Sequence, residues 1–298
     1  MVTERVARPT APAFERPRRR WGFARRLLRN PLLLVWGIVL LAMIAAAVFA
    51  PAVAPSDPLE QSNDLLVGPS RTHLFGTDEL GRDVFSRVIY GARISLSVGL
   101  VAVVIATVLG TTIGLVSGLA GGVVDNVTMR FIDILLAFPG IILAILIMAT
   151  LGPSLVNVMI AVGLSAIPWY ARTARASTLV VKEYDYILAT RAVGSGPLRI
   201  MVRHVLPNVI TPVIVLSTIG MAGAILAISG LSYIGLGAQP PSPEWGSMLS
   251  QARLYMQRAW WITTFPGIAI VMAVMAINLI GDALRDALDP RLRNVGKN

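Results

Sequence analysis

The feature that most constrains this chain is a series of apolar stretches, most of them long enough to cross a lipid bilayer. A hydrocarbon core about 30 Å thick needs roughly 20 helical residues at about 1.5 Å each. Six stretches approach or reach this length, and the fourth is the shortest and ends near Pro168: 32–54, 94–119, 131–151, 155–170, 209–229 and 262–284. We therefore predict an all-α membrane protein with six transmembrane helices.

The composition agrees with this prediction. Hydrophobic residues make up 55% of the chain and charged residues 14%, against about 25% charged residues in soluble proteins. The net charge of +10 could indicate a nucleic-acid partner, but the Arg and Lys residues cluster in segments that flank apolar stretches. We expect no nucleic-acid partner and interpret the clusters as signals of membrane orientation.

Basic segments stay in the cytoplasm because each cation costs about 2.5 to 3.5 kcal/mol at the centre of a membrane helix. Segments 1–31 and 172–206 are basic, whereas 55–93 balances acids against bases and 230–261 carries few charges. Six crossings then place both termini in the cytoplasm.

These segments define the expected organisation. It consists of a disordered basic cytoplasmic tail (1–31), a first transmembrane helix (32–54), an extracytoplasmic loop (55–93), a five-helix core (94–288) with a cytoplasmic loop (172–206) and an outer loop (230–261), and a cytoplasmic tail (289–298).

One alternative concerns the N-terminus. The string from Arg18 to Phe23 is similar to a twin-Arg export signal, and residues 50–54 could be a cleavage site. The apolar run that follows is longer than the about 7 to 15 residues of a signal peptide, so we prefer a retained helix.

The chain lacks the motifs of several kinds of chemistry. It contains no phosphate-binding loop of the form G-x-x-x-x-G-K-[ST], since its only Gly-Lys pair is Gly296 and Lys297. It should therefore not hydrolyse ATP by itself or act as an enzyme. Cysteine is absent, and His73 and His204 lie on opposite sides of the predicted membrane. We expect no metal site and no cofactor in this chain.

An ion-coupled secondary transporter would place ionisable groups near the middle of the bilayer. The candidates Asp133, Asp282 and Asp286 each lie close to a predicted helix end. Arg130 and Asp133 are three residues apart and could neutralise each other on one helical face. Secondary transport lacks its usual residues but stays open as an alternative, as does a membrane scaffold that moves no solute.

Glycines recur in the second predicted helix. Gly110, Gly114 and Gly118 fall four residues apart and form one stripe, where the missing side chains let another helix approach closely. We interpret this stripe as a helix-packing surface, and Gly220 and Gly223 in the same way.

The basic segment 172–206 is not linker-like. Apolar spacing predicts a helix over residues 176–193, Gly194 to Gly196 provide a stop, and Pro197 suits the first turn of a second helix that re-enters the membrane at Pro207. A helical hairpin with mixed apolar and basic surface suits docking on a partner protein. The alternative is an amphipathic segment that lies on anionic lipid.

The string from Leu188 to Gly194, followed by Ile200 and by Val205 to Asn208, resembles the EAA loop of ABC importer permeases. Two residues depart from the general pattern: Leu188 stands in place of Glu, and Thr190 in place of the second Ala. The resemblance implies that these residues contact an ATPase subunit: Leu188, Ala189, Thr190, Arg191, Gly194, Ile200, Leu206 and Pro207.

Two further segments, Phe75 to Leu96 and Leu231 to Gly246, are similar to the C-type permease of dipeptide and oligopeptide importers. They suggest an outer docking surface made by Asp78, Arg82, Asp83, Arg87, Pro240, Pro241 and Trp245. Asp83 and Arg87 have the spacing of a helical ion pair. The prolines would hold an extended turn beneath Trp245, although that Trp could instead be an interfacial anchor.

The resemblance implies a type I ABC importer permease fold in a bacterial cytoplasmic membrane. It also implies a homologous B-type permease, two ABC ATPase subunits that hold ATP and Mg, and an extracytoplasmic binding protein as partners. ATP would then move the hairpin over 176–206 as a rigid element. The implied cargo is a dipeptide or oligopeptide, with nickel, glutathione or haem as alternatives.

Overall fold

The computed structural model describes residues 31–288, so the expectations for the N-terminal tail, its export-like string and the C-terminal tail lie outside the described residues. The described chain is helical apart from loops and one isolated bridge between Thr77 and Asp83. Its elements are α2 (Pro31–Val48), α3 (Ala50–Val53), α4 (Val84–Ala120), α5 (Gly122–Leu136), α6 (Gly140–Leu151), α7 (Leu155–Val181), α8 (Asp185–Ala192), α9 (Pro197–Ile200), the π-helix η1 (Met201–Val205), α10 (Leu206–Tyr233), α11 (Trp245–Ala252) and α12 (Trp261–Leu288).

Five spans of the described chain are long and apolar enough to cross a membrane, and a sixth results if α5 and α6 form one broken span. The prediction of a single helix over 131–151 is wrong, because α5 and α6 meet at an angle of 92°. Pro139 lacks an N–H group and disfavours helical backbone at the residue before it. Helix α5 ends at Leu136, and α6 begins at Gly140, directly after Pro139.

Helix α7 is longer than predicted. It continues through Pro168 to Val181, so residues 172–181 belong to a helix and not to a loop. Neighbouring helices in a membrane bundle can compensate for the hydrogen bond that an internal proline removes. The helix predicted over 176–193 is therefore divided at residues 182–184, between α7 and α8.

The glycine stripe of α4 packs against α7, as predicted. A Cβ atom on Gly110 would lie 2.5 Å from Cβ of Tyr170, and one on Gly118 would lie 2.8 Å from Cγ2 of Thr178. Gly220 in α10 likewise faces the hydroxyl of Tyr170, whereas a Cβ atom on Gly223 would meet nothing within 4 Å outside its own helix among residues 31–288. The packing interpretation holds for the stripe and for Gly220.

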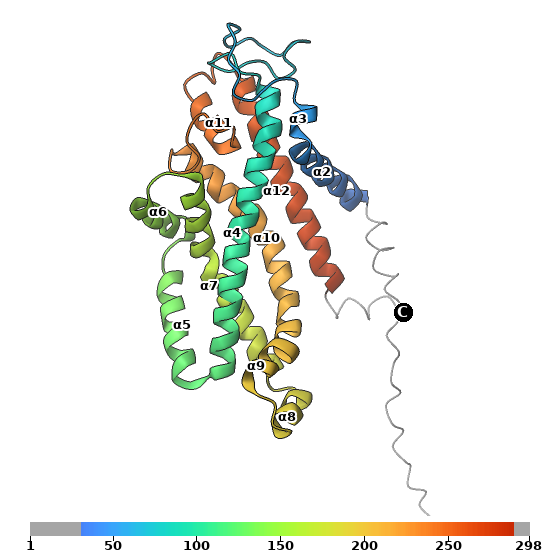
Figure 1. Ribbon diagram of the computed structural model, residues 1–298, viewed down its shortest axis with the longest axis vertical. Coiled ribbons are helices and arrows are strands. Elements are labelled where there is room, and N and C mark those ends of the chain that lie inside the picture. Colours follow the sequence, from blue (N-terminus) through green and yellow to red (C-terminus); the bar gives the residue numbers. More distant parts are fainter. Residues whose placement is uncertain (1–30, 289–298) are drawn as a thin grey trace, which may run out of the picture.

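Figure 1 shows two specialised ends of the bundle. At one end, residues 54–83 fold without a long helix over the start of α4 and lie near α11; we call residues 54–83 the cap. At the other end, residues 182–205, which include α8, α9 and η1, form a projection that we call the hairpin. Helix α4 runs between these two ends.

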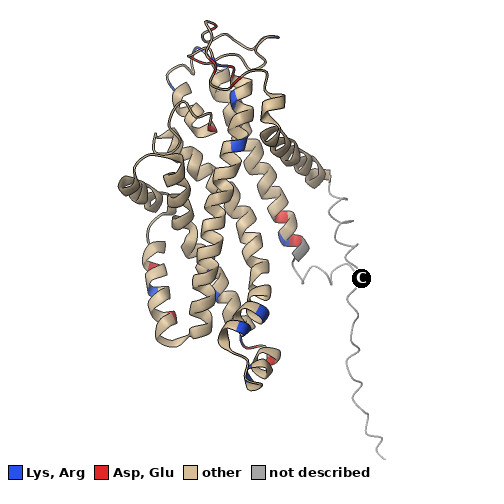
Figure 2. Cartoon of the chain, viewed as in Figure 1, with Lys and Arg blue, Asp and Glu red and all other residues tan. Residues whose placement is uncertain are grey.

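Figure 2 shows charged residues toward the two ends of the bundle and none in the middle parts of the long helices α4, α10 and α12. Helix α4 has no charged residue after Arg93, α10 has none, and α12 has none before Asp282. This pattern fits helices whose middle parts lie in hydrocarbon.

Helix α2 packs against α12 and α4 at the edge of the bundle. Ala47 is its only buried residue, and it attaches to the core through Leu40 and Met43. A helix that is apolar on every side fits exposure to lipid.

Candidate functional site

The hairpin begins where α7 ends. Gly194 has φ 83°, a left-handed conformation that favours glycine, and it follows the last turn of α8. Pro197 lies in the first turn of α9, where its missing N–H group costs nothing. Both local features agree with the sequence prediction.

The inner face of the hairpin is packed. Ile187 of α8 is fully buried and Ile200 is 3% exposed. Both belong to a cluster that includes Val181 at the end of α7 and Val209 in α10. This packing holds the hairpin against the helices that enter and leave it.

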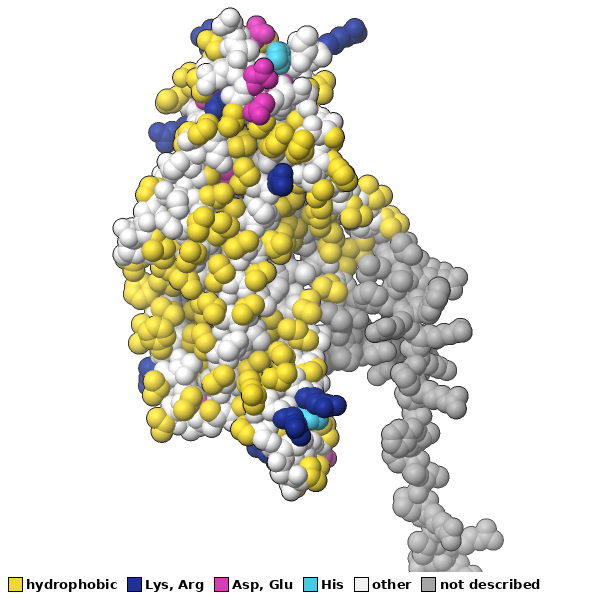
Figure 3. Space-filling view, in the orientation of Figure 1, with side chains coloured by type: hydrophobic (Ala, Val, Ile, Leu, Met, Phe, Trp, Pro, Cys, Tyr) yellow, Lys and Arg dark blue, Asp and Glu magenta, His cyan; other side chains and the backbone are white. Residues whose placement is uncertain are grey.

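The outer face of the hairpin is apolar and basic. Leu188 is 46% exposed, Leu198 67% and Val193 81%. Arg191 and Arg203 are also exposed, and Figure 3 shows basic side chains beside a histidine at this end. An exposed apolar surface with cations around it is typical of a docking site for another protein.

The eight coupling residues singled out in the sequence lie in the hairpin or, for Leu206 and Pro207, at the adjoining start of α10, and they divide into two kinds. Ile200 is core, and the hydroxyl of Thr190 donates to the carbonyl of Tyr186 at 2.6 Å. The others are exposed or half-buried and could contact a partner: Leu188, Ala189, Arg191, Gly194, Leu206 and Pro207.

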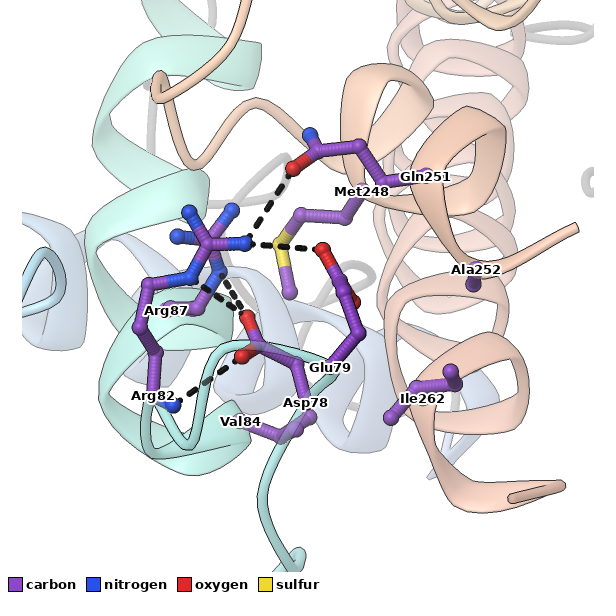
Figure 4. Close-up of a pocket in the computed structure, with 9 residues that line it drawn as sticks. All are labelled: Asp78, Glu79, Arg82, Val84, Arg87, Met248, Gln251, Ala252 and Ile262. Atoms are coloured by element: carbon purple, nitrogen blue, oxygen red, sulfur yellow. Dashed lines mark hydrogen bonds and ion pairs between the residues drawn. The ribbon is translucent and has the colours of Figure 1, made fainter. Parts of the chain in front are cut away.

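At the opposite end, the cap is built around the carboxylate of Asp78. Nε of Arg82 donates to Oδ2 of Asp78 at 2.7 Å, and Nε of Arg87 lies 3.4 Å from the same oxygen. Nη2 of Arg82 also donates to Glu79 at 3.1 Å and to Gln251 of α11 at 3.2 Å. Figure 4 shows these groups converging from the cap, α4 and α11.

Both guanidinium groups are almost inaccessible, since Arg82 is 2% and Arg87 1% exposed. The groups line one side of a small cavity of about 10 Å³, which is close to the space of one water molecule. A buried ion cluster tolerates the loss of hydration only when each group keeps its partners. The cluster therefore joins the cap to α4 and α11.

Two predicted ion pairs are wrong. Asp83 precedes the first turn of α4, where its side chain accepts from the N–H of Ser86 at 2.7 Å and contacts His73 at 3.2 Å. Because this N-cap carboxylate turns toward backbone N–H groups, Arg87 pairs with Asp78 instead.

Asp133 likewise pairs with Arg172 of α7 at 2.5 Å and not with Arg130. The partner comes from a helix far along the chain, which spacing within one helix does not reveal.

Trp245 is fully buried, which corrects both its predicted roles as a surface contact and as an interfacial anchor. Its Nε1 donates to the carbonyl of Val88 at 3.0 Å, and its backbone N–H donates to Ser95 at 3.2 Å. Asp78, Arg82, Asp83 and Arg87 are buried as well. Of the predicted outer docking residues, Pro240 and Pro241, joined by a cis peptide bond, are exposed.

Sequence reasoning missed Glu244, which is also fully buried. Its two carboxylate oxygens accept from the N–H groups of Gly246 at 2.9 Å and Ser247 at 2.8 Å and so cap α11. Burial raises the pKa of this carboxyl above its ordinary value. A carboxylate just before a short helix is a capping signal that could have identified it.

Comparison with known families agrees with this arrangement. Residues 110–294 match the family described as binding-protein-dependent transport system inner membrane component. The chain belongs to this family. Residues 20–69 match the N-terminal transmembrane domain of oligopeptide transport permease C.

Curated relatives extend the match along the chain. The chain is 47% identical to the di/tripeptide transport system permease DppC of Pseudomonas aeruginosa, covering 86% of this chain and 87% of that protein. It is 48% identical to the dipeptide permease DppC of Escherichia coli, covering 89% and 91%. For the dipeptide permease DppC of Alkalihalophilus pseudofirmus the identity is 45%, covering 91% and 89%.

Among solved structures, an inward-facing structure of the methionine ABC transporter MetNI is similar to this chain. The TM-score is 0.56 at 18% identity, covering 68% of this chain and 96% of that one. At this identity the likeness supports the fold alone. It confirms the predicted importer permease fold.

Family membership confirms several predictions made from the sequence. The protein is a multi-pass permease of the inner membrane, of the OppC/DppC type. It is a transport subunit of an ABC importer in which separate ATPase subunits bind and hydrolyse ATP. An importer is thereby favoured over an ion-coupled secondary transporter or a scaffold.

Proposed function

We propose that this chain is the C-type permease of an importer of dipeptides and tripeptides. The observation that carries the proposal is 45 to 48% identity to dipeptide permeases over about nine-tenths of the chain. In this proposal a homologous B-type permease pairs with it to enclose the translocation path. Nickel, glutathione and haem are the competing cargoes.

The hairpin is the part proposed to contact an ABC ATPase subunit in the cytoplasm. Its exposed Leu188, Val193 and Leu198 support a protein partner. The cations of α7 and the hairpin support a cytoplasmic position, because basic segments are retained there. Both termini then lie in the cytoplasm, and the cap faces the extracytoplasmic binding protein.

The experiment is uptake by proteoliposomes that hold the complete transporter with its binding protein. Labelled dipeptide added on the cap side should accumulate on the hairpin side. This accumulation should require ATP on the hairpin side. Accumulation of nickel, glutathione or haem without dipeptide uptake would contradict the proposed cargo.

Two changes in the hairpin test its role in the same assay. Gly194→Val forces a branched residue into a left-handed conformation, whereas Gly194→Asn is the matched control because Asn adopts that conformation more readily. Arg191→Glu reverses an exposed charge. We expect Gly194→Val and Arg191→Glu to abolish uptake at normal membrane insertion, and full uptake by both variants would contradict the coupling role.

Orientation is tested by labelling, since the chain has no cysteine of its own. Leu65→Cys in the cap and Val193→Cys in the hairpin replace side chains that are 58% and 81% exposed. A membrane-impermeant maleimide applied outside should label the cap position alone. Labelling of the hairpin position from outside would overturn the orientation.

A further inference from the structure

A partly buried ion pair lies near the hairpin, where α4, α5 and α7 meet. Arg175 of α7 holds Asp125 of α5 through two hydrogen bonds, from Nε to Oδ1 at 2.6 Å and from Nη2 to Oδ2 at 2.5 Å. Ser117, near the end of α4, donates to the same carboxylate. We call Ser117, Asp125 and Arg175 the clasp.

The clasp differs from a second ion pair between the same two helices. The side chains of Arg175 and Asp125 are 31% and 10% exposed, and two parallel hydrogen bonds join them, which is the strong form of an Arg–carboxylate contact. Arg172 and Asp133 also join α7 to α5, but their side chains are 53% and 47% exposed. Exposed pairs contribute little, so the second pair is a matched control for the first.

The clasp lies close to the end of α7, where the hairpin begins. Helix α7 ends at Val181, less than two turns after Arg175. The next residue, Lys182, donates from Nζ to the carbonyl of Gly118 in α4 at 3.3 Å. Since glycines already bring the backbone of α4 against α7, this leg of the hairpin is tied to the turn between α4 and α5.

The other leg of the hairpin is joined differently. It passes through the π-helix η1 and reaches α10 at Leu206 and Pro207. A π-helical turn often occurs at functional sites, and Pro207 supplies no N–H group to the helix. Within residues 31–288, no salt bridge joins this leg to another element.

We propose that Asp125 and Arg175 are positioning residues that make the hairpin, α4, α5 and α7 move as one body during the transport cycle. The inference rests on the proposed function, in which the hairpin receives its motion from an ATPase subunit. Glycine packing would still hold α4 against α7, but if the clasp were open the hairpin could turn about the end of α7 without displacing α5. ATP hydrolysis would then proceed with less transport.

The test is the ratio of dipeptide imported to ATP hydrolysed by the reconstituted transporter. Asp125→Asn keeps the side-chain shape and removes the charge that Arg175 binds. We expect the ratio to fall about fivefold or more, the lower end of typical coupling between sites, with ATPase activity retained. Asp133→Asn should keep the wild-type ratio. An unchanged ratio in Asp125→Asn, or an equal loss in Asp133→Asn, would overturn the proposal.

A second measurement does not depend on the cargo. Spin labels on Val123→Cys in α5 and Val193→Cys in the hairpin, at side chains 78% and 81% exposed, report the distance between the two elements. In the labelled chain that keeps Asp125, this distance should be the same with and without ATP. In the labelled Asp125→Asn variant, the distance should change when ATP is added. If Asp125→Asn does not fold, Arg175→Lys, which keeps the charge but loses the fork, gives the same comparison.

A distance that changes with ATP in the otherwise wild-type chain would contradict movement as one body. If the distances behave as expected but the unmodified transporter imports no dipeptide, the proposed cargo fails and the clasp stands. The two proposals therefore fail in different measurements.

Discussion

The cap and the hairpin occupy opposite ends of one bundle and differ in which kinds of side chain they bury and which they expose. At the cap end, charged groups are buried and have partners: Arg82 and Arg87 pair with Asp78, and Glu244 accepts from backbone N–H groups at the start of α11. In the hairpin, large apolar groups stay exposed, as Val193 and Leu198 show. The first arrangement is complete within one chain, whereas the second leaves apolar surface that a partner would cover.

The difference shows where each end obtains its stability. Removing one member of a buried pair leaves an uncompensated charge, so the cap should be sensitive to single changes. Exposed side chains contribute little to folding, so the hairpin should tolerate changes that nevertheless weaken assembly. The following predictions test this comparison.

The largest effect is expected for Arg87→Ala. This change leaves Asp78 buried with one cation fewer and should destabilise the protein by about 3 to 5 kcal/mol. Arg71→Ala, at an exposed cap residue, is the control and should have little effect. Thermal denaturation of the purified transporter measures both, and equal melting temperatures would contradict the structural role of the buried cluster.

A smaller effect is expected for Glu244→Gln. The amide keeps one acceptor oxygen but presents N–H groups to a backbone donor, at a cost of about 1 to 3 kcal/mol.

The same variant predicts a pH dependence. Because burial raises the folded-state pKa of Glu244, its proton-linked stability is fully present below the unfolded pKa of about 4.3 and is lost as pH rises through the folded pKa. The wild type should therefore gain stability relative to Glu244→Gln, and the difference between their melting temperatures should widen, as pH is lowered from neutrality toward about 4.3. Melting temperatures across this range measure it, and a constant gap would contradict the raised pKa.

The smallest effect on stability is expected for Leu198→Ser. This side chain is 67% exposed, so the change should alter stability by no more than about 0.5 kcal/mol. It should nevertheless reduce the amount of ATPase that copurifies. Leu59→Ser, at a cap side chain that is 46% exposed, should leave copurification unchanged, and a loss in both variants would remove the distinction between the two ends.

The sequence predicted the membrane segments well because an apolar run in a bilayer has few alternatives to a helix. It predicted the turn of the hairpin well because Gly194 and Pro197 act through local backbone conformation. It could not distinguish Pro139, which ends a helix, from Pro168, which does not. Pro168 is buried between packed helices, whereas Pro139 is exposed and followed by Gly140, and that packing is a tertiary property.

The ion pairs show the same limit. Spacing within one helix suggested pairs for Asp83 and Asp133, but the structure gives them His73 and Arg172 as partners. Asp125 was not identified, because its partner Arg175 lies 50 residues away. Charge pairing in a membrane bundle follows contacts between helices, and sequence spacing does not report those contacts.

Helix α4 links the two ends without a break. It begins beside the buried cluster of the cap and ends at the clasp, with 37 residues and a length of about 55 Å. A hydrogen-bonded rod of this kind resists shortening, so a tilt imposed at one end must appear at the other. A binding protein that docks on the cap and ATPase subunits that close around the hairpin would thus act on opposite ends of the same helix.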